Sequence, residues 1–320
     1  MRTLHLYAIL ITAICSTLIH AESDTRPSVW AWEVNSQNRK IYLLGEIHYF
    51  VFHENSVPKI SYNLGEKILD KSSEIWIEEQ QSLPKSDNGQ RNLSYQVSST
   101  TWNLIKTGFR NAINSMRNLE TQERDELYKT YITRLDWQDP LAASQSLTIF
   151  ANANITRSKP NYVYIPGLKY FILEKNNNLF NQKIKKLETT QAGYEAWWNN
   201  CNSKEKAETI INNALAKQDK KYDFSINQNL IYQSIFFKTD ENINSFVNAT
   251  MSNEIEKIYM DCVGIPRSKL WMPSIVEKLS TTGAPITFLV GIGHIGGENG
   301  LLSLLKKHGF TDIKRIYSVD

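Results

Sequence analysis

The sequence predicts a mixed α/β fold, with a central mixed sheet formed by both chain ends, flanking helices and a large helical insertion. Residues 28–80 and 284–319 carry short, continuous apolar runs that end at turn or polar residues. Such runs are typical of strands buried on both faces of a sheet. Residues from about 95 to 280 are instead rich in Asn, Lys and Gln, with apolar residues at helical spacing. We therefore expect one domain over residues 22–320.

Residues 1–21 have the order of a secretory signal peptide. Arg2 gives a basic start, and an uncharged apolar run extends from Leu4 to Ile19 before small residues follow. The run is short for a membrane span, which needs about 20 residues. We expect export to the periplasm or the extracellular space. An uncleaved anchor and a lipid attached at Cys15 are the alternatives.

Composition narrows the classes of partner. The net charge is +3 for the whole chain, too small to favour nucleic acid. No stretch after the leader is apolar enough to cross a bilayer, so the mature chain is expected to have no integral membrane segment. It keeps Cys201 and Cys262, and in an exported protein these two can form a disulfide.

Two predicted strands, Val29–Val34 and Ile41–Leu44, are joined by a turn at Ser36–Arg39. A helix over Ile60–Leu69 is expected to lead into a short strand at Glu74–Glu78. The segment 81–95, with Pro, Ser, Asp, Asn and Gly close together, is predicted to be a loop.

The C-terminal part predicts a strand at Pro285–Val290, a leucine-rich helix from Leu301 that ends near Gly309, and a final strand at Ile313–Val319. The middle of the chain predicts helices near 101–118, 120–134, 168–178, 204–218, 226–238 and 242–258.

Polar residues follow three of these strands. Of the four histidines left after the leader, two close the pattern Gly-x-x-His directly after an apolar strand, at Gly45–His48 and Gly291–His294. A third strand ends in the acidic pair Glu78 and Glu79. Because ligands bind outside the carboxyl ends of strands in open α/β sheets, we expect these side chains to meet.

Two imidazoles and a carboxylate are a common ligand set for a divalent transition metal with an open position. Such a metal polarises a carbonyl or activates water, and a further carboxylate can act as general base. Glu46 lies two residues before His48, on the same face of a strand, so it is a candidate ligand or base. Zinc, manganese, cobalt and iron all suit these ligands. The alternative is that both histidines are hydrogen-bonded structural residues.

Three segments resemble the TraB/GumN family: LLGEIH ending at His48, SSEIWIEE ending at Glu79, and TFLVGIGHIGGENGLLSLLKKHGF around His294. The last is similar to the family pattern VGxGHLxGxxGLLxLLxxxGY in nearly every position. Weaker similarities lie at RLDWQDPLAA, GLKYFIL and IKKLETTQ, and at Arg267 before Trp271. The family includes the Tiki-type membrane-associated proteases and the pheromone-shutdown proteins.

The resemblance implies a fold related to erythromycin esterase and to the haem-binding lipoprotein ChaN. It also implies metal-dependent hydrolysis of a peptide or protein substrate. The leading hypothesis is thus an exported metallopeptidase that uses manganese, cobalt or zinc. By position, the resemblance implies that His48, Glu78 and His294 are essential, and the leading hypothesis makes them the metal ligands. The same hypothesis gives proton transfer to Glu46 or Glu79. Arg267, a catalytic candidate, and Glu188, a possible additional ligand, match further family positions.

The chain departs from the family pattern at Glu46, where Thr is usual, at Gln80, where Asp or Asn is usual, and at Lys169, where an acid is typical. The two lost acids favour an alternative in which the same scaffold binds a peptide or a haem-like ligand without cleaving it. A small-molecule esterase is a further alternative. The oligomeric state is left open by the sequence.

Overall fold

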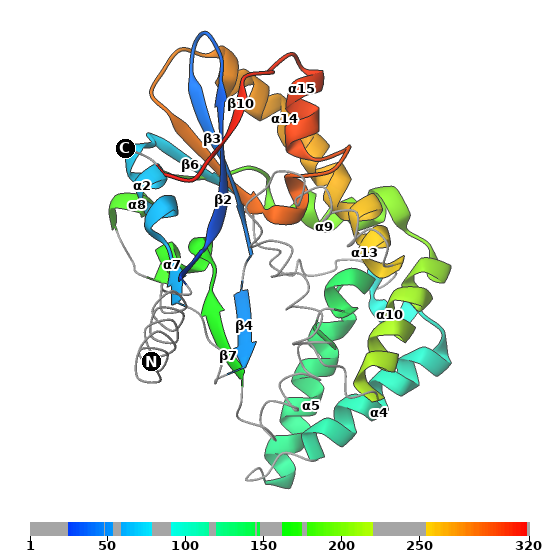
Figure 1. Ribbon diagram of the computed structural model, residues 1–320. Helices are drawn as coiled ribbons and strands as arrows, with labels where there is room; N and C mark the ends of the chain where they lie inside the picture. Colours follow the sequence, from blue (N-terminus) through cyan, green and yellow to red (C-terminus); the bar gives the residue numbers. More distant parts are fainter. Residues whose placement is uncertain are drawn as a thin grey trace, which may run out of the picture.

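The computed structural model describes residues 25–47, 49–53, 59–78, 91–114, 120–144, 146–147, 162–174, 178–219 and 254–318 (Figure 1). The predicted signal peptide, the predicted helix at 226–238 and most of the predicted loop at 81–95 lie outside these ranges, as do His48 and Glu79. Within the described residues, no helix is long and apolar enough to cross a membrane.

A six-stranded mixed sheet forms the centre of the fold, in the order β10-β2-β3-β9-β6-β8. Strands β3, β9, β6 and β8 are parallel, whereas β2 and β10 are antiparallel to their neighbours. This confirms the predicted fold class. The strands are β2 (Val29–Asn35), β3 (Lys40–Glu46), β6 (Glu74–Ile77), β8 (Ile184–Lys186), β9 (Ile286–Gly291) and β10 (Ile313–Ile316).

The expectation that both chain ends supply the whole sheet is wrong for one edge. Strand β8 comes from the middle of the chain and pairs with β6. It has only three residues, and Lys185 and Lys186 are exposed. Short, charged strands are common at sheet edges, where they discourage further pairing. Such a strand has no apolar run that sequence patterning could detect.

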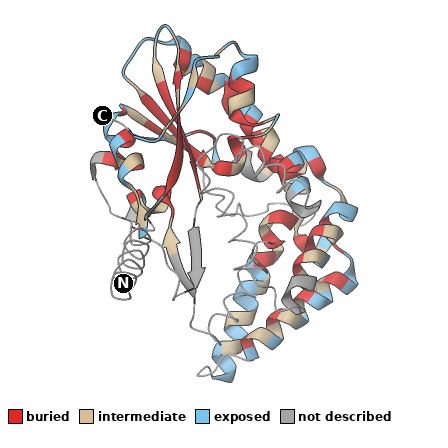
Figure 2. Cartoon of the chain, viewed as in Figure 1, coloured by how far each residue is buried: buried red, intermediate tan, exposed pale blue. Residues whose placement is uncertain are grey.

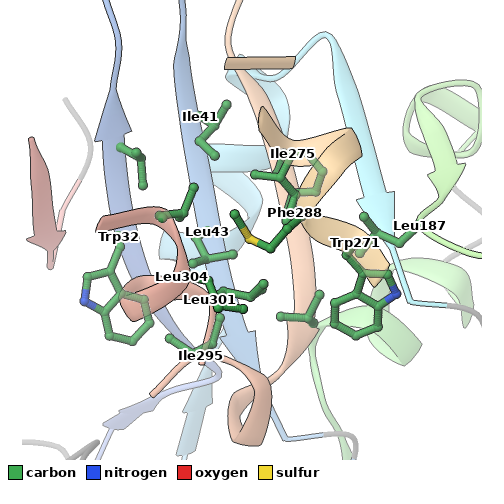
Figure 3. Close-up of a cluster of buried hydrophobic side chains, with 14 of the residues drawn as sticks. Trp32, Ile41, Leu43, Leu187, Trp271, Ile275, Phe288, Ile295, Leu301 and Leu304 are labelled. Carbon is green, nitrogen blue, oxygen red and sulfur yellow. The ribbon is translucent and has the colours of Figure 1, made fainter. Parts of the chain in front are cut away.

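Helices cover both faces of the sheet, and buried residues run along its central strands (Figures 1 and 2). Alternate residues of β3 point to opposite faces, as strand geometry requires. Ile41 and Leu43 pack with α14 (Ile265–Ser280) and α15 (Leu301–Lys307), as Figure 3 shows. Tyr42 and Leu44 belong to a separate cluster with residues of α2 (Asn63–Lys71) and α7 (Leu168–Glu174). The central strands are therefore buried on both sides.

The helical insertion builds a hydrophobic core of its own, in which Ile105, Phe109 and the fully buried Trp197 take part. The predicted helices near 101–118, 120–134 and 204–218 correspond to α4, α5 and α10. The helices of this insertion are α3 (Leu93–Gln96), α4 (Ser99–Asn114), α5 (Thr121–Asp136), α9 (Thr190–Cys201), α10 (Lys204–Asp219) and α13 (Glu254–Tyr259). The short helix α8 (Asn178–Asn181) instead lies on the sheet, where its Phe180 joins the cluster of α2 and α7.

Several element boundaries differ from the sequence prediction. The predicted helix at 60–69 begins only at Asn63, because the residues before it form a strand that pairs with another short segment. The antiparallel pair β4·β7 was also not predicted. Both are two-stranded sheets, whose partners are distant in sequence and so leave no local signal. The strands concerned are β1 (Thr25–Pro27), β4 (Tyr49–His53), β5 (Lys59–Ser61) and β7 (Tyr162–Pro166).

One long helix connects the helical core to the sheet. It runs from α13 through a π-helical turn at Met260–Gly264 into α14. Pro266 has no N–H, so it cannot donate the ordinary helical hydrogen bond to the Cys262 carbonyl. Cys262 lies in the π-helical turn and forms a disulfide with Cys201 at the end of α9, with the two Cα atoms 5.4 Å apart. The structure therefore forms a pair that the sequence only allowed.

Removal of this disulfide should destabilise the protein. The two cysteines are 61 residues apart, and the loop-entropy relation gives about 4 kcal/mol for a loop of that size. We expect denaturant titrations to show that the free energy of unfolding of the Cys201→Ser/Cys262→Ser variant is lower than that of the wild type by about this amount. Wild-type protein with a reducing agent is the matched control and should match the variant. An unchanged midpoint under reduction would contradict the assignment.

A second prediction concerns Asp139, which is buried and accepts hydrogen bonds from the backbone N–H groups of Leu141 at 2.9 Å and Ala142 at 3.0 Å. Burial raises its pKa from 3.8 to about 6, although these hydrogen bonds act to lower it. Because the folded protein then binds this proton more tightly than the unfolded chain, the contribution of Asp139 to stability falls as pH rises from about 4 to about 6.

Asp139→Asn keeps an oxygen acceptor at this position and removes the titration. Between about pH 4 and pH 7, the difference in unfolding free energy should shift in favour of the variant by on the order of 3 kcal/mol. Comparing the two proteins cancels the titration of all other groups. A difference that stays constant with pH would rule out the raised pKa.

Candidate functional site

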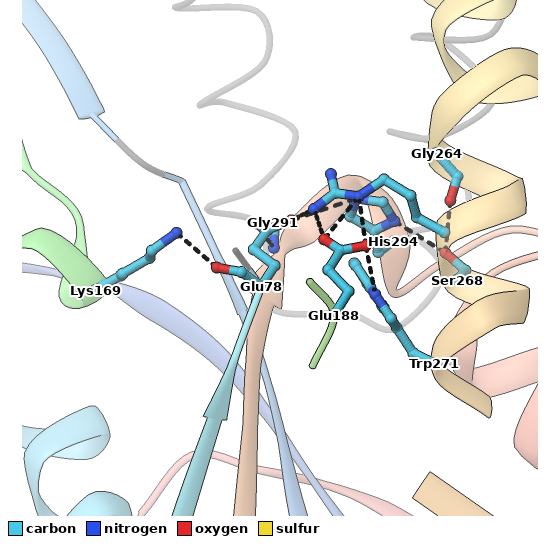
Figure 4. A network of polar contacts seen from close by, with 9 residues as sticks. Glu78, Lys169, Glu188, Gly264, Ser268, Trp271, Gly291 and His294 are labelled. Carbon is cyan, nitrogen blue, oxygen red and sulfur yellow. Dashed lines mark hydrogen bonds and ion pairs between the residues drawn. The ribbon is translucent and has the colours of Figure 1, made fainter. Parts of the chain in front are cut away.

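Four buried polar side chains lie at the carboxyl ends of the four parallel strands. Glu46 ends β3, Glu78 follows β6, Glu188 follows β8 and His294 follows β9. None is more than 7% exposed. They therefore occupy the edge of the sheet where open α/β proteins bind ligands, and Figure 4 shows three of them close together.

Glu78 is the central member of this cluster. Its Oε1 accepts a hydrogen bond from the backbone N–H of Gly291 at 2.9 Å. Its Oε2 lies 3.4 Å from Nη2 of Arg267 and 3.7 Å from Nε2 of His294. One carboxylate thus contacts strand β9, helix α14 and the turn that carries His294.

The first glycine of each Gly-x-x-His pattern has a packing role. A Cβ at Gly45 would lie 2.4 Å from Cδ1 of Ile292 and 3.0 Å from Cγ1 of Ile295. A Cβ at Gly291 would lie 3.3 Å from Oε1 of Glu78. Glycine at both positions lets β3 pack against the His294 turn and lets Glu78 reach the backbone of β9.

Arg267 joins two carboxylates. Its Nε donates to Glu188 at 2.9 Å to Oε1 and 3.1 Å to Oε2, and its Nη2 also bonds Oε1. Trp271 donates from Nε1 to the other oxygen of Glu188 at 3.0 Å. Glu188, considered from the sequence as a possible additional metal ligand, therefore holds Arg267 in this structure. Such bidentate pairs are strong and directional.

The charge of Arg267 is stabilised by its surroundings. Burial by itself lowers the pKa of the guanidinium, but the charge of Glu78 and the hydrogen bonds to Glu188 raise it by more. The net pKa lies above the ordinary value, so Arg267 is a permanent cation beside Glu78.

Lys169 brings a second cation to the site. It is 2% exposed, its backbone N–H donates to Glu46 Oε2 at 2.7 Å, and its Nζ donates to the Glu78 carbonyl at 3.1 Å. In sequence it stood out only as a departure from the family pattern. Its position at the start of α7 fixes the Glu46 carboxylate and the end of β6 together.

Helix α14 supplies Ser268, which the sequence analysis did not single out, and Trp271, which it named only for its place after Arg267. Ser268 lies 2.9 Å from Nδ1 of His294, and the Trp271 ring lies 4.6 Å from the imidazole between centroids. Gly264, Arg267, Ser268 and Trp271 are spaced as one helix face. That spacing was available in the sequence, but the two prolines of α14 (Pro266 and Pro273) suggest breaks rather than one continuous helix.

Part of the predicted metal site can be tested on this geometry. Two ligand atoms at zinc-like bond lengths of about 2.0–2.2 Å lie roughly 3.3–3.6 Å apart around one tetrahedral ion. The 3.7 Å between Glu78 Oε2 and His294 Nε2 is near that separation. Among the described residues, no group of three His, Cys, Asp or Glu could hold a metal, and His48, the third predicted ligand, lies outside them. The described residues therefore fit two of the three proposed ligands.

Fold and site together define an α/β protein with a buried carboxylate, imidazole and guanidinium centre at the carboxyl edge of a mixed sheet. The model of the TraB/PrgY/gumN family matches residues 30–312, and the chain belongs to this family. No curated protein and no solved structure matches the chain. The ChaN-like architecture implied by the resemblance therefore stays a prediction.

The central ion pairs generate a stability prediction. Arg267→Met leaves Glu78 and Glu188 buried without their shared cation, and breaking a buried pair in this way costs about 3–5 kcal/mol. We expect the midpoint of denaturant unfolding to fall accordingly. The control is Lys269→Met, an exposed cation on the same helix, which should change little.

Glu188→Gln should restore part of the loss when combined with Arg267→Met, because one of the two uncompensated charges is then absent. If Arg267→Met behaves like the Lys269→Met control, the ion-pair network does not support the fold as described.

Proposed function

We propose that this protein is an exported, metal-dependent hydrolase, specifically a metallopeptidase acting on peptide or protein substrates. The observation that carries the proposal is the pairing of Glu78 with His294 across 3.7 Å, both buried, at the carboxyl edge of the sheet. Two lone-pair donors facing each other at this distance suit a shared cation. His48 would complete the set.

A bound divalent cation supplies a Lewis acid that polarises a scissile carbonyl and acidifies water. Glu78 and His294, with His48, would hold that cation. Glu46 is a buried carboxylate whose position is set by the backbone N–H of Lys169, so we assign it the role of accepting a proton. Glu79 is the other candidate for this role.

Arg267 would act on charge rather than on protons, because its raised pKa keeps it protonated. Lying 3.4 Å from Glu78, its guanidinium can stabilise negative charge that develops near that carboxylate. Glu188 would hold the guanidinium in place, because it accepts a hydrogen bond from Arg267 Nε. Trp271 would in turn hold Glu188, because its Nε1 donates to that carboxylate.

Export is supported by two independent features of the chain. The first residues have the order of a signal peptide. The Cys201–Cys262 disulfide is of a kind that forms and persists in oxidising compartments outside the cytoplasm.

A second candidate function is a peptide- or haem-binding protein without catalysis. Lys169 favours it, because a buried ammonium donates to the Glu78 carbonyl at 3.1 Å and adds positive charge beside the proposed cation site. Added positive charge weakens the binding of a second cation.

Metal content and hydrolysis would separate these functions. We expect elemental mass spectrometry to find near-stoichiometric manganese, cobalt or zinc in the purified protein and in His308→Ala, an exposed control histidine. The His48→Ala/His294→Ala variant should lose the metal, and chelation should abolish cleavage of a peptide panel. Absence of metal after incubation with all three ions would overturn the proposal in favour of the binding protein. Cleavage of esters alone would favour the esterase.

A further inference from the structure

We propose that Ser268 is a positioning residue that holds His294 in the tautomer protonated on Nδ1, so that the Nε2 lone pair faces Glu78. The tautomer is independent of the proposed hydrolase. Its consequence for metal affinity rests on that proposed function.

The hydrogen bonds around Ser268 determine the direction of this contact. A hydroxyl has one proton to donate. The Ser268 hydroxyl donates to the Gly264 carbonyl at 2.9 Å, four residues back along the helix. Its oxygen lies 2.9 Å from His294 Nδ1, so it accepts from that nitrogen. The neutral imidazole then carries its proton on Nδ1.

The opposite side of the ring faces Glu78. Nε2 lies 3.7 Å from the nearest Glu78 oxygen, beyond the 2.7–3.2 Å range of an N–H···O hydrogen bond. The contact of Nδ1 with Ser268, at 2.9 Å, is the shorter of the two. Ser268 and His294 are 1% and 4% exposed, which limits competition from water.

The helix backbone places Ser268 at this point. The π-helical turn at Met260–Gly264 immediately precedes α14. Because such a turn takes in one extra residue, the residues beyond it are rotated by about 100° relative to a regular continuation of α13. Ser268 and Trp271 then share the face that meets the imidazole, and the Trp271 ring packs against it at 4.6 Å. The ring is thus fixed both in orientation and in protonation.

The consequence concerns the proposed metal. A ligating histidine is oriented when its other ring nitrogen donates to a neighbouring group, and loss of that partner typically costs about 10–100-fold in metal affinity. We therefore expect Ser268→Ala to bind manganese, cobalt or zinc about 10–100-fold more weakly. Ser268→Thr, which keeps the hydroxyl, should restore most of the affinity.

The direct test is ¹⁵N NMR of the histidine ring nitrogens in the full, metal-free protein at mildly alkaline pH, with His294 assigned from a His294→Gln variant. We expect a protonated Nδ1 and an unprotonated Nε2 in the wild type and in Ser268→Thr. Ser268→Ala should shift the population toward protonated Nε2. Ser280→Ala is the matched control, because Ser280 makes the same bond to the carbonyl four residues back, at 2.9 Å, on the same helix.

A protonated Nε2 in the wild type, with Nδ1 protonated or not, would overturn the proposal. So would a Ser268→Ala spectrum identical to that of the wild type. If the tautomer depends on Ser268 but no metal binds, the proposed hydrolase fails and the positioning role stands. If metal binds equally well to the wild type and to Ser268→Ala, the positioning role fails and the hydrolase stands.

Discussion

The compensation of buried charge at the carboxyl edge of the sheet is the constraint on which the rest of the structure depends. Burying a carboxylate without a partner is costly, and the cost is offset only by a nearby cation and well-formed hydrogen bonds. Glu78 and Glu188 both meet this requirement through Arg267. The requirement therefore brings the ends of β6 and β8 and the face of α14 to one point.

Helix α14 connects this charge network to the rest of the molecule. One of its faces covers the sheet with Trp271, Ile275 and Leu279, and the same helix carries Arg267 and Ser268 into the site. Its first turn follows the π-helical segment that the disulfide ties to α9. The apolar packing and the polar site thus share one rigid element, which suits a centre whose groups must be held within a fraction of an ångström.

The site has two parts that differ in how closely their residues match the family pattern. Glu78 and His294 form the part that resembles the family most closely, and they lie within 3.7 Å of each other. Glu46 and Lys169 form the part that departs from the family, and they are bonded through the Lys169 backbone N–H. These two departures therefore occur together in space, beside Glu78, and bear on what the centre binds or cleaves; Gln80, the third, lies outside the described residues.

Much of this was predictable from local patterns. The continuous apolar runs of β2, β3 and β9, the glycine at 309 that ends α15 with φ of +89°, and the Gly-x-x-His pattern at 291–294 are local features, because strand burial and turn conformation leave marks in neighbouring residues. Elements without such marks were missed. Strand β8 is a three-residue charged edge strand. Helix α14 contains Pro266 in its first turn, where proline is tolerated, and Pro273 at an exposed position further along.

The sequence by itself determined the fold class, the family pattern and the polar residues that end three of the strands. Only the tertiary structure decided that Glu188 bonds Arg267, that Lys169 reaches the Glu78 carbonyl and that Ser268 contacts His294. These contacts join residues far apart in the chain, and they depend on the order of strands in the sheet and the rotation of α14. Neither quantity is encoded in the spacing of residues along the sequence.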